Sequence, residues 1–316
     1  MKKILIYEYI TGGGLLNEDL SSNLMFEASA ILSSLIESCN RSTKFDYRYF
    51  IDHRLTDMHS DKSVVTRHSK DLYNMNLIKN FDYVIPVIPE INSDLLKYVK
   101  YLEKNNINKI ISNSETIEIC SDKLKFYKYL NKSNIPVIPS YNSLEIESKS
   151  KKYIVKDRHG AGCSFIKITN DKDLKNDYSN DKIIQPFIDG ENYSLSVFFG
   201  KHDFRLLTIN QQYFNINNDM IKLQGLSINI YHKLYLNILS VISDISDYLP
   251  GLYGFVGIDV LIEDTQLFIV EINPRITTSY VGLNESIGCN MIDLLINYKY
   301  IKNVITSRKY YLENNE

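Results

Sequence analysis

Apolar residues in the first part of the chain form short runs that alternate between strand-like and helix-like spacing. Strands are predicted at residues 3–9, 45–51, 83–87 and 109–112. One face of a helix between the first two strands is formed by Leu24, Ala28, Ile31, Leu32 and Leu35. A second helical stretch covers residues 93–103. Such alternation favours a small α/β lobe built on a parallel sheet.

Beyond this lobe a short helix is predicted at 121–130, and strand-like runs then follow one another. These runs lie at 153–156, 182–188, 193–199, 204–213, 257–262 and 267–273. Consecutive strands of this kind favour an antiparallel α+β region. We therefore expect an N-terminal α/β lobe over residues 1–112, a small subdomain over 113–190 and a C-terminal subdomain over 191–316.

The 316 residues carry 36 basic and 38 acidic side chains, which gives a net charge of −2. Without a basic field, neither nucleic acid nor an anionic membrane is an expected partner. The longest apolar runs are far shorter than a membrane span, which predicts no membrane-crossing segment. The four cysteines are widely spaced and lack a C-x-x-C pair, which is typical of reduced thiols in the cytoplasm. The sequence leaves room for a homodimer.

Two late apolar runs carry the most informative polar residues, Asp259, Glu271 and Asn273. Glu271 and Asn273 are two apart in a strand and point to one face. If the runs form a hairpin with residues 264–266 as a three-residue loop, Asp259 lies opposite Glu271. These oxygen ligands suit Mg²⁺, with Mn²⁺ as an alternative, together with the phosphates of a nucleotide. Otherwise the acids would be solvated residues on an exposed sheet face.

Four further segments could contact a nucleotide. Lys156 ends an apolar run just before a loop with Gly160 and Gly162, which predicts a cation and backbone N–H groups beside phosphates. The chain has no G-x-x-x-x-G-K-[ST] motif and is therefore not a P-loop protein. Arg275 follows the metal strand and could bind further phosphate oxygens.

The run Gln185-Pro186-Phe187-Ile188 could present its backbone to an adenine edge, with Glu191 binding ribose hydroxyls. Near the N-terminus, Thr11-Gly12-Gly13-Gly14 follows a strand but does not complete the G-x-G-x-x-G motif of dinucleotide-binding proteins. These glycines could cradle a carboxylate or phosphate, or they could simply form a tight turn.

The order of a lysine, a glycine loop, a linker and an acidic hairpin resembles the ATP-grasp superfamily of carboxylate-amine ligases over nearly the whole chain. The resemblance implies an ATP-grasp fold, in which two α+β subdomains clasp ATP behind an N-terminal parallel α/β lobe. It also implies ATP-binding roles for Lys123, Lys156, Gly160, Gly162, Gln185, Phe187, Ile188 and Glu191, and metal-binding roles for Asp259, Glu271 and Asn273. Many members carry Arg where this chain has Gly257, and Arg275 or, less favourably, Lys222 could supply that charge.

Two segments, residues 7–14 and 271–283, are similar to the tyramine–glutamate ligases of methanofuran biosynthesis and in part to a pyrrolysine-pathway ligase. This resemblance implies substrate contacts at Glu8, Gly12 and Gly13. Thr277, Thr278 and Ser279 follow the metal strand and could face the substrates, or they could form a helix entry rich in hydroxyl groups.

The expected reaction is an ATP-dependent amide synthesis through an acyl phosphate, with Lys156 and Arg275 as catalytic residues. Glutamate and tyramine are the expected substrates. Another pair of amino acid and amine is an alternative, and so is a nucleotide-binding module without catalysis.

Overall fold

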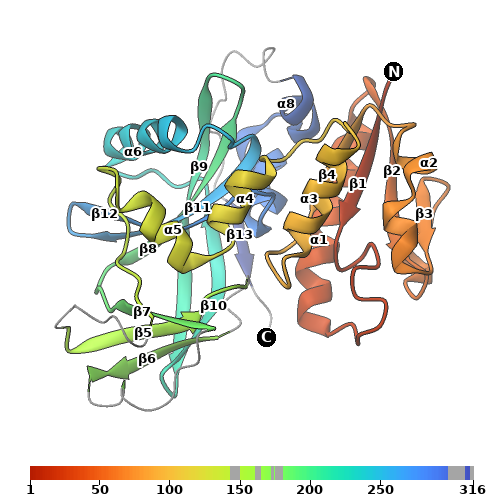
Figure 1. Cartoon of the computed structure of the whole chain (residues 1–316). Helices are drawn as coiled ribbons and strands as arrows, with labels where there is room; N and C mark the ends of the chain where they lie inside the picture. Colours follow the sequence, from red (N-terminus) through yellow and green to blue (C-terminus); the bar gives the residue numbers. More distant parts are fainter. Residues whose placement is uncertain (143–149, 161–164, 172–173, 175–180, 298–309, 314–316) are drawn as a thin grey trace.

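The computed structural model describes residues 1–142, 150–160, 165–171, 174, 181–297 and 310–313. Two sheets organise this part of the chain (Figure 1). A four-stranded sheet forms the N-terminal lobe, drawn in red and orange on one side of the molecule. A nine-stranded sheet forms the rest and carries the long strands seen on the other side.

The N-terminal sheet is parallel throughout and has the strand order β3-β2-β1-β4. Its strands are β1 (Lys2–Glu8), β2 (Phe45–Asp52), β3 (Ser63–Thr66) and β4 (Tyr83–Val87). The chain leaves β1 toward β2 on one side, whereas β4 pairs with β1 on the other, so the strand order reverses between β1 and β4. In open α/β sheets, ligands bind beyond the carboxyl ends of strands at such a switch point.

Helices cover this sheet and connect it to the remainder of the chain. They are α1 (Ser22–Arg41), η1 (Thr56–Met58), η2 (Ser69–Tyr73), α2 (Met75–Ile78), α3 (Asp94–Lys104), α4 (Ser114–Cys120) and α5 (Lys123–Leu130). Leu32 and Leu35 of α1 are fully buried in the same cluster as Ile4 and Ile6 of β1. The apolar stripe predicted from the sequence is thus the face of α1 that packs on the sheet.

The larger sheet has the order β12-β11-β8-β9-β10-β6-β5-β7, with β13 paired to β10, and every pairing between these strands is antiparallel. Its strands are β5 (Lys152–Asp157), β6 (Ile166–Asn170), β7 (Lys182–Pro186), β8 (Glu191–Phe199), β9 (Phe204–Asn217), β10 (Met220–Ile228), β11 (Gly254–Glu263), β12 (Gln266–Asn273) and β13 (Tyr310–Glu313). The remaining helices are α6 (Tyr235–Tyr248), η4 (Thr278–Gly282), α7 (Leu283–Ile287) and α8 (Met291–Asn297).

Helix α6 covers one face of the larger sheet and leaves the opposite face for the site. Ile238, Ile242 and Ile245 recur at helical spacing and are fully buried against the core that includes Leu195 and Val197 of β8. Side chains alternate along a strand, so Ser194 and Ser196 lie on the other face of β8. Polar residues therefore gather on the face away from α6.

The structure corrects the predicted strand at residues 109–112. Lys109 forms only an isolated bridge with Val84, and the chain then turns toward α4. Ile110 and Ile111 are buried, so their apolar character reflects packing at the boundary of the lobe. The subdomain boundaries after residues 112 and 190 stay predictions.

Candidate active site

The two carboxylates predicted to bind a metal face one another in the β11–β12 hairpin. Asp259 and Glu271 are directly paired, as the sequence predicted. The predicted three-residue loop is wrong, because Glu263 pairs with Gln266 and only two residues form the turn. A β-bulge shifts the register by one residue between the Val260–Ile269 pair and the Asp259–Glu271 pair. This shift compensates for the shorter turn, so Asp259 still pairs with Glu271.

Amide side chains surround Asp259. The Nδ2 group of Asn273 donates to one carboxylate oxygen of Asp259 at 3.0 Å, and the Nε2 group of Gln212 donates to the other at 3.0 Å. The structure thus brings the three predicted metal ligands together and adds Gln212, which the sequence did not single out. Within the described residues, no group of three His, Cys, Asp or Glu side chains is arranged to hold a metal. The amide oxygens, the nucleotide and water would have to complete a coordination shell.

The two carboxylates differ in electrostatic environment. Burial, followed by the negative charge of Glu271, raises the pKa of Asp259. Burial also acts to raise the pKa of Glu271, but the Lys123 and Lys156 cations outweigh it and hold that pKa well below its usual value. The Lys123 Nζ atom lies 3.5 Å from a Glu271 carboxylate oxygen. Burial and the neighbouring Glu271 charge both disfavour the ionised form of Asp259, and a divalent cation bound here would offset them.

A cavity of about 350 Å³ opens between this hairpin and the β5–β6–β7 strands. Its lining includes both carboxylates and six of the residues predicted to bind ATP: Lys123, Lys156, Gly160, Gln185, Phe187 and Ile188. Gly162 lies outside the described residues. Many other lining side chains are apolar, among them Ile138, Phe165, Phe214 and Leu261. The cavity thus has an apolar part and an end lined by lysines and carboxylates. This arrangement suits an adenine ring joined to phosphates and a divalent cation.

Two contacts fix polar groups of this cavity. Lys123 begins α5, and its Nζ group donates to the Gly160 carbonyl oxygen at 2.9 Å. Gln185 is buried and donates through Nε2 to the Ser140 hydroxyl at 2.8 Å. Ser140 therefore holds the side-chain amide of Gln185, and the backbone beyond Gln185 could contact an adenine edge.

The structure does not bring Glu191 to this cavity. The Tyr193 hydroxyl donates to the Glu191 carboxylate at 2.7 Å, and Tyr193 belongs to the core on the α6 side of β8. Asn192, one residue later, lines the cavity instead. Because neighbouring side chains in a strand point to opposite faces, the predicted position was one residue out of phase.

A second cavity of about 200 Å³ extends from the same two carboxylates toward the N-terminal lobe. Its lining includes the predicted residues Glu8, Asn273, Arg275, Thr277, Thr278 and Ser279. Helix α1 forms another wall, with Glu27 among the lining residues. Glu27 could not be predicted from the sequence, because an acid on a helix is most often a solvated surface residue. The two cavities share Asp259 and Glu271, so a metal bound there would touch ligands in both.

Arg275 joins the two lobes at this second cavity. Its Nε and Nη2 groups donate to one Glu90 carboxylate oxygen at 2.9 and 2.6 Å, and its Nη1 group donates to the Ile276 carbonyl oxygen at 3.1 Å. Both side chains are nearly buried. Lys222, the weaker candidate, is exposed and lines neither cavity.

Thr277 precedes η4, and Thr278 and Ser279 are its first residues, but no side chain caps the start of this helix. The Thr278 hydroxyl donates to Glu27 at 3.2 Å instead, and the Ser279 hydroxyl lies 3.0 Å from the Ser196 hydroxyl. A Cβ added at Gly257 would lie 2.8 Å from a methyl carbon of Thr277, so Thr277 occupies the space that a side chain at 257 would need.

The glycine-rich segment after β1 forms a packed turn. A Cβ at Gly12 would lie 2.3 Å from the Glu8 carbonyl oxygen, and Gly13 has a φ of +94° beside Thr66. Neither glycine lines the second cavity. The Glu8 carboxylate accepts from the Thr11 hydroxyl at 2.6 Å and from the Thr11 and Ile10 N–H groups. These contacts favour the tight-turn interpretation for Gly12 and Gly13.

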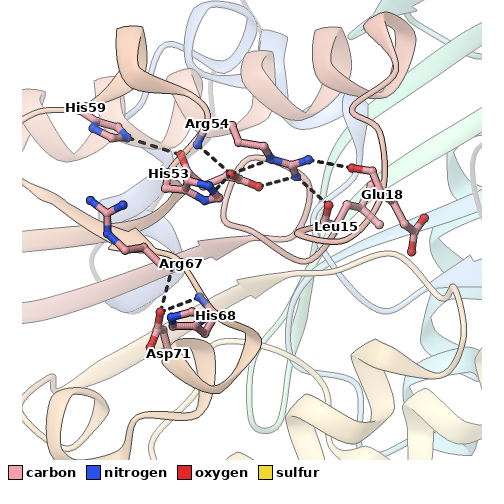
Figure 2. Close-up of polar contacts among 9 residues, drawn as sticks. Leu15, Glu18, His53, Arg54, His59, Arg67, His68 and Asp71 are labelled. Carbon is pink, nitrogen blue, oxygen red and sulfur yellow. Dashed lines mark hydrogen bonds and ion pairs between the residues drawn. The ribbon is translucent and has the colours of Figure 1, made fainter.

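Arg54 holds this turn against the sheet (Figure 2). Its guanidinium donates to the Leu15 and Glu18 carbonyl oxygens at 2.7 and 2.8 Å and to both carboxylate oxygens of Asp52. Asp52 is fully buried. Burial acts to raise the pKa of Asp52, but hydrogen bonds from Arg54 outweigh it and hold this pKa low.

We expect Arg54→Met to lower the free energy of unfolding by about 3 kcal/mol at neutral pH, because it leaves a buried carboxylate without its cation. Urea unfolding would measure the loss. A carboxyl with a lowered pKa stabilises the fold above its unfolded pKa of about 4, so the difference from wild type should shrink as the pH falls below that value. Arg48→Met, the same change at an exposed position of β2, is the control. Equal stability of the two variants would contradict the role of Arg54.

Comparison with known proteins decides the family. The model of the ATP-grasp domain matches residues 120–279, about half of the chain. The chain belongs to the ATP-grasp family. It is 28% identical over 286 residues to the tyramine–L-glutamate ligase of Methanocaldococcus fervens, and the match covers 89% of each protein.

Solved structures agree with this assignment. A structure from Archaeoglobus fulgidus assigned to the ATP-grasp superfamily matches with a TM-score of 0.78 at 23% identity, covering 99% of this chain and 92% of the other. The L-amino acid ligase of Bacillus licheniformis matches with a TM-score of 0.70 at 16% identity, covering 98% and 79%. The expected α/β and α+β ATP-grasp fold is therefore confirmed.

The ATP-grasp family and its relatives make this chain an ATP-dependent carboxylate-amine ligase that uses ATP with a divalent cation and acts on small molecules. No helix among the described residues is both long and apolar enough to cross a membrane.

Proposed function

We propose that this ATP-grasp ligase joins the γ-carboxylate of glutamate to the amine of tyramine, with Mg²⁺ as its divalent ion. The observation that carries the proposal is the meeting of two cavities at Asp259 and Glu271. One cavity suits ATP, and the other reaches the same carboxylates from the N-terminal lobe. The similarity to a tyramine–L-glutamate ligase along 89% of the chain supports this substrate pair.

The donor set fits Mg²⁺, since two carboxylates and neighbouring amide oxygens are hard oxygen ligands. Asp259, Glu271 and Asn273 would hold the ion, which would neutralise phosphate charge when bound. Mn²⁺ accepts the same ligands. Lys123 and Lys156 line the first cavity beside Glu271 and would bind phosphate oxygens of ATP.

In the proposed reaction, a γ-carboxylate oxygen of glutamate attacks the γ-phosphorus of ATP, and ADP leaves. The ammonium group of tyramine loses one proton, and its nitrogen then attacks the acyl carbon. Phosphate leaves, and the nitrogen loses a second proton. The residues of this chain position the reactants and balance charge. Lys156 would contact the transferred phosphoryl group from the first cavity, and Arg275 would contact it from the second.

Two other expectations stay predictions. Cys39, Cys120 and Cys289 are free thiols in the structure, which is compatible with the expected cytoplasmic location, whereas Cys163 lies outside the described residues. Association into a homodimer would be measured by light scattering.

We expect purified protein to release ADP only when ATP, Mg²⁺, glutamate and tyramine are all present, with one ADP for each amide. The measurement couples ADP release to the mass of the product, which should equal glutamate plus tyramine minus water. A panel of other amines and acids, each replacing one substrate, serves as the control.

A product formed only with another amine would reject tyramine and keep the ligase reaction. ATP binding without ADP release under every substrate combination would favour a nucleotide-binding module that has lost catalysis.

A further inference from the structure

Helix α1 presents one mixed face to the second cavity. Leu24, Glu27, Ala28 and Ile31 recur at helical spacing, and all four line this cavity. Leu223 and Leu226 of β10 also line it. The wall beside α1 is therefore apolar apart from the Glu27 carboxylate and the Thr278 hydroxyl that contacts it.

The carboxylates that line this cavity have different surroundings. Both oxygens of Glu8 accept hydrogen bonds from its own turn, through Ile10 and Thr11. Asp259 and Glu271 lie together in the β11–β12 hairpin. Glu27 comes from α1 and accepts from the Thr278 hydroxyl at 3.2 Å. It thus places negative charge on a wall separate from the metal site.

Buried hydroxyl groups fix the segment that carries Thr278. The Thr277 hydroxyl lies 3.1 Å from the Ser279 hydroxyl, which in turn lies 3.0 Å from the Ser196 hydroxyl. The Nδ2 group of Asn210 donates to the Ser196 hydroxyl at 3.0 Å. Ser196, Asn210 and Ser279 are all buried, so this network holds the loop rigidly and sets where Glu27 meets Thr278.

We propose that Glu27 binds the ammonium group of the amine substrate, while Leu24, Ala28 and Ile31 contact its apolar body. This inference rests on the proposed ligase function and assigns the choice of amine substrate to residues of α1. A carboxylate in an apolar wall complements a ligand with one cationic end and an otherwise apolar body, and tyramine is such a ligand.

Glutamate complements this wall poorly, because it carries two carboxylates besides its ammonium group. Among the described residues that line the second cavity, Arg275 is the one with a permanently cationic side chain. It follows β12, the strand that carries Glu271 and Asn273. The carboxylates of glutamate are therefore better accommodated on the side of the metal-binding residues than beside Glu27. The two substrates would then approach the site from different walls, with the amine on the α1 side.

The test compares Glu27→Gln with Glu37→Gln, the same change at an exposed position of the same helix. We expect Glu27→Gln to raise the KM for tyramine by about 10- to 100-fold, the effect of losing one charge-assisted hydrogen bond. The KM for glutamate should stay within about twofold, as for conservative changes elsewhere. Calorimetry with tyramine and a non-hydrolysable ATP analogue should show the same weakening without turnover.

Two probes separate this role from a general defect. Hydroxylamine is uncharged at neutral pH and traps the acyl phosphate as a hydroxamate, so its reaction with glutamate and ATP should be unchanged in Glu27→Gln. 4-Ethylphenol, which is tyramine without its amine, should inhibit wild type and variant equally.

An unchanged affinity for tyramine in Glu27→Gln, or a loss confined to glutamate, would overturn the proposal and leave the ligase function intact. Tyramine binding that depends on Glu27 in a protein that forms no hydroxamate and no amide would support this site and reject the proposed reaction. Wild-type protein that neither binds nor couples tyramine, yet forms hydroxamate, would reject tyramine and this site together.

Discussion

Glu271→Gln should lower the rate of ADP release on the order of 10³-fold or more, with the fold retained. The change keeps the size of the side chain and removes the charge that Lys123 and Lys156 stabilise. Asp259 would then be the one carboxylate of the hairpin pair left to a divalent ion. Steady-state ADP release over a range of Mg²⁺ concentrations would measure the effect, and high Mg²⁺ should restore only a small part of the rate.

The matched control is Glu263→Gln, which makes the same change in the same hairpin next to its turn, away from both cavities. It should retain nearly all activity. Thermal unfolding of both variants checks the fold. Substantial ADP release by correctly folded Glu271→Gln would count against the role of Glu271 at the metal.

The pairing of Asp259 with Glu271 could be predicted because alternation along a strand and the short hairpin constrain the register. The loop length was nevertheless wrong by one residue, and the β-bulge beside Asp259 compensated for it. The extra residue is Val270, because Asp259 pairs with Glu271 and Val260 with Ile269, and no glycine or proline marks it. A bulge without such a marker depends on contacts across the sheet, so it cannot be predicted from the strand itself.

The phase of a strand caused the other local error. Glu191 and Asn192 start β8 and point to opposite faces of it. Tyr193, Leu195 and Val197 form the buried side toward α6, and Glu191 is in phase with them. The alternation of these residues with Ser194 and Ser196 carries this phase in the sequence, so Asn192 could have been placed on the cavity side without the structure.

Contacts between segments far apart in the chain could not be predicted from the sequence. Glu27 and Thr278 are 251 positions apart, and Glu90 and Arg275 are 185 apart. Arg275 was predicted from its place after the metal strand, whereas its partner Glu90 follows β4 in the N-terminal lobe. Only the packing of the two lobes brings these residues to one cavity.

This pairing complicates any test of Arg275, because its removal leaves Glu90 buried without a cation. The second carboxylate oxygen of Glu90 has no hydrogen-bond partner within the described structure. Arg275→Met should therefore cost about 3 to 5 kcal/mol of stability, whatever the role of Arg275 in catalysis. The double variant Glu90→Gln with Arg275→Met removes the unpaired charge and should recover most of that loss.

Activity should not recover with stability. If Arg275 stabilises charge on the transferred phosphoryl group, both the single and the double variant should show kcat lowered by about 10³-fold. Arg275→Lys should recover little, since an ammonium group cannot make the two-pronged contacts of a guanidinium. Steady-state kinetics beside urea unfolding separates the two effects. A double variant that regained both stability and activity would show that Arg275 only neutralises Glu90 and joins the lobes.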